Sequence, residues 1–71
     1  MNIYEVQCKQ KFMGGAYIST IFTEKKLALD EAATQARNYD EVIVYEYVLT
    51  DGRFYVTKSL VHYGEDIEDL I

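Results

Sequence analysis

Two adjacent residues, Asp51 and Gly52, narrow the possible folds of this chain more than any other pair. They separate two long segments, 41–50 and 53–63, that are rich in β-branched and aromatic residues. Asp-Gly is favoured in the two-residue type I′ turn, because both central residues of that turn need a positive φ. The sequence therefore predicts a long β-hairpin.

A two-residue turn also fixes the register of the hairpin. The predicted pairs are Leu49 with Phe54, Tyr47 with Val56, Tyr45 with Lys58, and Ile43 with Leu60. Paired residues lie on the same face of a sheet, and successive residues alternate between faces. We expect the face that carries these mostly large apolar side chains to be the core face: Ile43, Tyr45, Tyr47, Leu49, Phe54, Val56 and Leu60.

The opposite face of the predicted hairpin is more apolar than exposure to solvent requires. Its residues are Val42, Val44, Glu46, Val48, Tyr55 and Val61. Exposed apolar patches on small proteins commonly mark interaction sites. The sequence therefore predicts that this outer face binds a partner.

The first half of the chain predicts two more strands and a helix. The alternation of residues 3–12 predicts a half-buried strand, with Tyr4, Val6, Cys8 and Phe12 on its apolar face and Glu5, Gln7, Lys9 and Lys11 on its polar face. Residues 16–22 favour a returning strand after a turn at the two glycines. Residues 24–37 are good helix formers, and Thr23 is the predicted N-cap. One narrow apolar stripe on this helix is expected from Leu29, Ala32, Ala33 and Ala36.

This β-β-α-β-β order predicts an α+β fold. We expect an antiparallel sheet of three to four strands, with one helix packed on one face. With 71 residues there is room for a single domain, which we expect to span residues 1–64. Residues 65–71 then form an acidic C-terminal tail.

The net charge of −5 is concentrated in that tail. Four of the twelve acidic side chains lie there, namely Glu65, Asp66, Glu68 and Asp69. The rest of the chain has eight acidic and seven basic side chains, so we expect no direct binding to nucleic acid. The tail is interpreted as a docking segment, a nucleic-acid mimic or only a solubilising segment, and the sequence leaves these alternatives open.

The residue types do not favour catalysis or metal binding. Cys8 and His62 are the only residues of their kinds, which excludes an internal disulfide and a zinc site. Ser59 and His62 are three residues apart on a predicted strand, so their side chains point to opposite faces and cannot form an activated pair. We expect no enzymatic activity and no cofactor.

The chain shows no secretory signal and no apolar run of the length that crosses a bilayer. A lone cysteine suits a reducing compartment. These features predict a soluble cytoplasmic protein without membrane partners.

In pattern, the helix segment FTEKKLALDEAATQA followed by DEVIVYEYVLTDGRFYV resembles small accessory proteins of bacterial viruses. This group includes anti-CRISPR proteins and the inhibitors with which such viruses take over their host. The resemblance covers the architecture of the whole chain. It implies inhibition of a host defence protein by occupying one of its sites, sometimes by mimicking DNA. The balanced charge of the body leaves only the tail as a mimic of DNA.

The sequence therefore predicts a non-enzymatic module that binds a host protein and inhibits it by occlusion. The alternative is a self-associating structural or adaptor protein that homodimerises through its outer sheet face. In the first interpretation, the outer hairpin face and the acidic tail together contact the partner.

Overall fold

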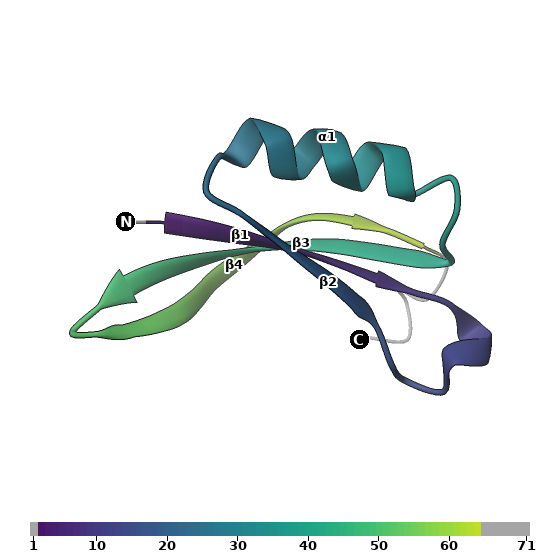
Figure 1. Cartoon of the computed structure of the whole chain (residues 1–71), viewed down its shortest axis with the longest axis horizontal. Coiled ribbons are helices and arrows are strands. Elements are labelled where there is room, and N and C mark those ends of the chain that lie inside the picture. The colour runs from purple at the N-terminus through teal and green to yellow at the C-terminus, as the bar shows by residue number, and fades with distance from the viewer. Residues whose placement is uncertain (1, 65–71) are drawn as a thin grey trace.

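The computed structural model describes residues 2–64. One helix, α1 (Lys25–Gln35), lies across one side of a four-stranded antiparallel sheet (Figure 1). The strands are β1 (Asn2–Lys9), β2 (Ile18–Phe22), β3 (Glu41–Thr50) and β4 (Arg53–Tyr63), in the spatial order β2-β1-β3-β4. The predicted α+β fold with its β-β-α-β-β order is confirmed.

Strand β1 is shorter than its sequence pattern suggested. It ends at Lys9, and the chain then forms a short 3-10 helix, η1 (Lys11–Met13). Phe12 lies in η1 and is 85% exposed, although the alternation placed it on the apolar face. The turn continues through Gly14, whose φ of 63° lies in the left-handed region that favours glycine.

The hairpin turn at Asp51 and Gly52 is confirmed. Their φ angles are 52° and 77°, as a type I′ turn requires. Next to the turn, Leu49 pairs with Phe54 and Tyr47 with Val56, as predicted. The local part of the register therefore follows from the turn chemistry.

Further from the turn, the predicted register is wrong. The pairing shifts between Glu46 and Tyr47 and again between Val44 and Tyr45, and at each shift β4 contributes one extra residue. Such β-bulges add a residue to one strand and increase its twist. Tyr45 consequently pairs with Ser59 in place of Lys58, and Ile43 pairs with His62 in place of Leu60.

Helix α1 covers the sheet face opposite to the predicted one. Val42 and Val44 are completely buried, although we expected both on an exposed partner-binding face. They belong to the core cluster, beside Val6 and Cys8 of β1, because Val6 pairs with Val44 and Cys8 pairs with Val42. The assignment of the two hairpin faces is therefore reversed for this half of the sheet.

The physical reason for the reversal is the shape of the helix stripe. Ala28 and Ala32 are both completely buried, and such short side chains let the helix approach the sheet closely. Val6, Val42 and Val44 of the covered face have almost no exposed surface and suit this close approach, whereas the inner strand β3 carries the larger Tyr45 and Tyr47 on the other face. Of the predicted stripe, Ala32 is buried and Leu29 and Ala36 pack against the core, whereas Ala33 is exposed and Ala28 is buried in its stead.

The N-cap of α1 is Glu24, not the predicted Thr23. Glu24 has the extended backbone of a cap residue (φ −118°, ψ 127°) but makes no capping hydrogen bond with its side chain. Serine is a preferred N-cap, because its short side chain reaches the free N–H groups of the first turn. We therefore expect Glu24→Ser to stabilise the protein by about 0.5–1 kcal/mol in urea unfolding, whereas Thr23→Ala changes little. A loss of about 1 kcal/mol in Thr23→Ala alone would restore Thr23 as the cap.

Gly52 is expected to tolerate substitution poorly. A side chain there meets no neighbour, so the cost comes from the backbone, whose φ of 77° is unfavourable for a β-branched residue. Gly52→Val is expected to lower the free energy of unfolding by more than about 1 kcal/mol. Gly52→Asn is the matched control, because asparagine tolerates the left-handed region, and it should cost clearly less. Equal melting curves for the two variants would contradict the turn assignment.

Candidate functional site

The side of the sheet that α1 does not cover is called the open face here. Alternation and the observed register place the odd-numbered residues of β1 and β3 on it, together with their partners in β2 and β4. Its residues, from one end of the sheet to the other, are Lys9, Glu41, His62, Ile43, Gln7, Ser19, Ser59, Tyr45, Glu5, Ile21, Ile3, Tyr47, Val56, Leu49 and Phe54. The open face thus has a polar centre, an apolar hairpin end, and a charged end formed by Lys9, Glu41 and His62.

Glu5 lies at the centre of the open face, on the inner strand β1. It is only 8% exposed, and three side chains from three strands donate hydrogen bonds to its carboxylate. Ser19 Oγ lies 2.6 Å from Oε2, Tyr47 Oη lies 2.5 Å from Oε1, and Gln7 Nε2 lies 3.1 Å from Oε1. The carboxylate is therefore held in one fixed position.

The electrostatics of this group favour a charged Glu5 beside a neutral Tyr47. Burial alone would raise the pKa of Glu5 by desolvation, but the hydrogen bonds from Ser19, Tyr47 and Gln7 outweigh it and hold that pKa below its ordinary value. The hydrogen bond to Glu5, with burial as the next cause, raises the pKa of Tyr47 to about 12. At neutral pH, Glu5 is an anion and Tyr47 keeps its proton.

Glu5 is stabilised by hydrogen-bond donors and not by an ion pair. Within residues 2–64 the ion pair joins Lys9 Nζ to the carboxylate of Glu41 at 3.5 Å, and that carboxylate also lies at hydrogen-bond distance, 3.0 Å, from His62 Nε2. Buried charges in proteins are usually paired. Within residues 2–64, the carboxylate of Glu5 is held by hydrogen bonds alone, which leaves a fixed negative charge at the centre of the open face.

The hairpin end of the open face is apolar and exposed. Leu49 and Phe54 form a cross-strand pair that is 38% and 45% exposed, and Val56 is 53% exposed. The last pair between β1 and β3 is Asn2 with Val48, so the Leu49–Phe54 pair projects beyond β1 (Figure 1). This projecting end leaves apolar surface available for contact.

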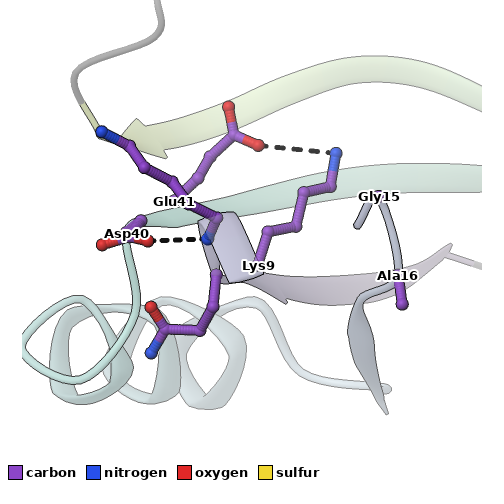
Figure 2. Close-up of a pocket in the computed structure, with 7 residues that line it drawn as sticks. Lys9, Gly15, Ala16, Asp40 and Glu41 are labelled. Carbon is purple, nitrogen blue, oxygen red and sulfur yellow. Dashed lines mark hydrogen bonds and ion pairs between the residues drawn. The ribbon is translucent and has the colours of Figure 1, made fainter. Parts of the chain in front are cut away.

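A small pocket lies at the other end of the sheet, beside Lys9 and Glu41 (Figure 2). The backbone N–H of Lys11 donates a 2.8 Å hydrogen bond to Asp40 there, and Lys9 contacts Glu41 (Figure 2). The cavity volume is about 160 Å³, below the roughly 300–1,000 Å³ of small-molecule sites. Its charged groups hold the loop after β1 against the start of β3.

The structure does not bring the predicted partner-binding residues together on one exposed surface. Val42 and Val44 lie beneath α1, and Val61 is half-buried against the same core. Glu46 and Val48 are also half-buried. The other predicted members fall into two groups: Tyr55 is 51% exposed, while Glu65, Asp66, Glu68 and Asp69 lie outside the described residues.

Sequence reasoning missed the carboxylate site of Glu5. Alternation placed Glu5 and Gln7 together on a polar face of β1, which is typical of a strand face in contact with solvent. Only the long-range pairing shows that β1 is an inner strand, with Ser19 on one side and Tyr47 on the other. A glutamate on the more polar face of an alternating strand carries no local signal of burial.

Cys8, the single thiol, lies in the core and not at a reactive site. It is 5% exposed, and burial, together with the negative charge of Glu31, raises the pKa of the thiol. Within the part of the chain that the structure describes, no three His, Cys, Asp or Glu side chains are grouped to hold a metal ion. None of the helices described there has the length and apolar character needed to cross a membrane.

Comparisons of the chain with protein-family models, with curated proteins and with solved structures gave no match.

Proposed function

We propose that this protein is a non-enzymatic module that binds another protein through the open face of its sheet. The observation that carries the proposal is the composition of that face: a fixed, ionised Glu5 beside an exposed apolar and aromatic hairpin end. Aromatic side chains are enriched at protein interfaces, and uncovered apolar patches commonly mark them. The surface differs from the one that the sequence predicted, whereas the class of function stays the same.

The proposed mode of action is occlusion of a site on a host protein. Strands β1 and β3 are paired on both sides, so the centre of the open face is a preorganised surface that loses little conformational freedom on binding. Its fixed negative charge favours a partner that presents a basic group among apolar residues. The resemblance to inhibitors from bacterial viruses supports a host defence protein as this partner.

Homodimerisation through the sheet face, the alternative function, is less well supported. The outer hairpin face first considered for it contains the buried Val42 and Val44. On the open face, a two-fold axis through the centre would bring two Glu5 carboxylates close together in a low dielectric, which is unfavourable. A partner that is a different protein brings no second Glu5 carboxylate to the interface, so this repulsion does not arise.

The experiment is an affinity capture from bacterial lysate with three purified forms of the chain. The double variant Phe54→Ser/Val56→Lys changes the open face, and Tyr55→Ser changes the exposed residue between them, which points to the other side. We expect the wild type and Tyr55→Ser to retain the same partner and the double variant to lose it. Loss in both variants, or in neither, would contradict the open face as the binding surface.

Inhibition is tested separately with the captured partner. Its activity is measured with increasing amounts of wild-type protein and of the double variant, after circular dichroism has shown that both are folded. We expect inhibition by the wild type alone. Binding without any change in the partner's activity would keep the binding function and reject the inhibitor.

A further inference from the structure

Strand β2 leaves one edge of the sheet without protection. It pairs with β1 through five consecutive residue pairs without a bulge, and within residues 2–64 no strand pairs with its other side. Its sequence, Ile-Ser-Thr-Ile-Phe, contains no charge and no proline, and four of its five residues are exposed. Unpaired edge strands of this kind are templates for pairing with another strand.

The opposite edge of the sheet has the protection that β2 lacks. Strand β4 is interrupted by two register shifts and carries Arg53 and Lys58. Bulges and basic side chains are the devices by which edge strands avoid pairing with other chains. The contrast between the two edges makes β2 the edge that is available for pairing.

We propose that β2 pairs antiparallel with β2 of a second copy of this chain, which joins two four-stranded sheets into one of eight strands. In the register that pairs all five residues, Thr20 faces Thr20 of the partner subunit. Ile18 then faces Phe22 of the partner subunit on the helix side of the sheet. This contact is isologous, since both copies use the same strand.

The charge distribution favours a second copy as the occupant. Residues 1–64 carry eight acidic and seven basic side chains, so the bodies of two copies have little net charge with which to repel each other. Strand β2 is uncharged, and pairing it with itself brings no like charges together. It also covers Ile18, which is 47% exposed, and aligns two threonines, a favourable cross-strand pair.

The proposed dimer is independent of the proposed binding function. A two-fold axis perpendicular to the sheet leaves both helices on one side and both open faces free on the other. The dimer therefore goes beyond the open-face proposal and presents two copies of the same binding surface to partners. Either proposal can fail without the other.

The first test is the molar mass in solution of the full chain, measured by light scattering over a range of concentrations. We expect the wild type to be a dimer and Thr20→Lys to be a monomer, because that variant places two ammonium groups at the axis. Thr57→Lys is the matched control on the exposed β4 edge and should remain a dimer. A monomeric wild type, a dimeric Thr20→Lys, or a Thr57→Lys that is equally monomeric would each overturn the proposal.

A second pair of variants keeps the test decisive if Thr20→Lys does not fold. Thr20→Cys and Thr57→Cys are smaller changes at the same exposed positions, and the native Cys8 is 5% exposed and does not compete. Treatment with a short bifunctional maleimide should yield covalent dimers of Thr20→Cys and leave Thr57→Cys monomeric. Equal cross-linking of the two variants, or none in either, would overturn pairing at β2.

Discussion

Val44→Lys is expected to unfold this protein. Val44 is completely buried, pairs with Val6 on the inner strand β1, and lies in the core cluster with Ala28 and Ala32 of α1. A lysine there would bury an unpaired ammonium at a cost of several kcal/mol, and its longer side chain would push the helix from the sheet. A domain of 71 residues has a total stability of only about 4–10 kcal/mol.

The measurement is the thermal unfolding transition by circular dichroism, with Val56→Lys as the matched control. Val56 lies on the same hairpin but is 53% exposed on the open face, so the same change should cost no more than about 0.5 kcal/mol. If Val44→Lys melted like the wild type and Val56→Lys did not, the helix would cover the other face of the sheet.

The sequence was sufficient for features of the fold that depend on neighbouring residues. The turn at Asp51-Gly52 was predicted correctly because its backbone angles are set by those two residues. The burial of Val6 and Cys8 was also predicted, since alternation along one strand is a local pattern. In each case the required information lies within a few residues.

The register of the hairpin and the face that the helix covers both depend on non-local features. The bulges in β4 are not marked by glycine or proline, and between them Lys58 and Ser59 exchange faces, whereas Val61 stays on the face of Val44. The position of the helix depends on how a stripe centred on Ala28 and Ala32 fits each sheet face, and both faces are apolar enough to attract it. The alternation of apolar and polar residues does not indicate which of the two sheet faces the helix covers.

The site around Glu5 was missed for a related reason. Two of its three donors, Ser19 and Tyr47, lie 14 and 42 residues further along the chain, and only Gln7 is a near neighbour in sequence. Sequence spacing does not indicate which of the seven tyrosines meets which acid. The pairing of β1 with both β2 and β3 supplies that information.

Removing the carboxylate of Glu5 is expected to cost about 2–4 kcal/mol at neutral pH, measured as the free energy of urea unfolding of Glu5→Ala. The variant loses hydrogen bonds to a charged group, each worth about 1.5–3 kcal/mol, and leaves donors on Ser19 and Tyr47 without their acceptor. Water entering from the open face replaces part of this loss, so the total stays below the sum. Tyr47→Phe removes only one of these bonds and should cost about 1–2 kcal/mol.

The pH dependence distinguishes the lost charge from a simple loss of packing. Because the pKa of Glu5 in the folded protein lies below its ordinary value of 4.5, the unfolded chain binds a proton more readily than the folded chain. The stability from the ionised carboxylate is therefore fully present above about pH 4.5 and is lost as the pH falls through the lower folded pKa. The difference in unfolding free energy between wild type and Glu5→Ala should shrink over that acidic range.

In Tyr47→Phe, the loss of one donor raises the pKa of Glu5, so the stability that the carboxylate contributes should be lost nearer to pH 4.5. A difference that is constant with pH, or that grows as the pH falls, would mean that Glu5 is not the buried anion on which the binding proposal depends.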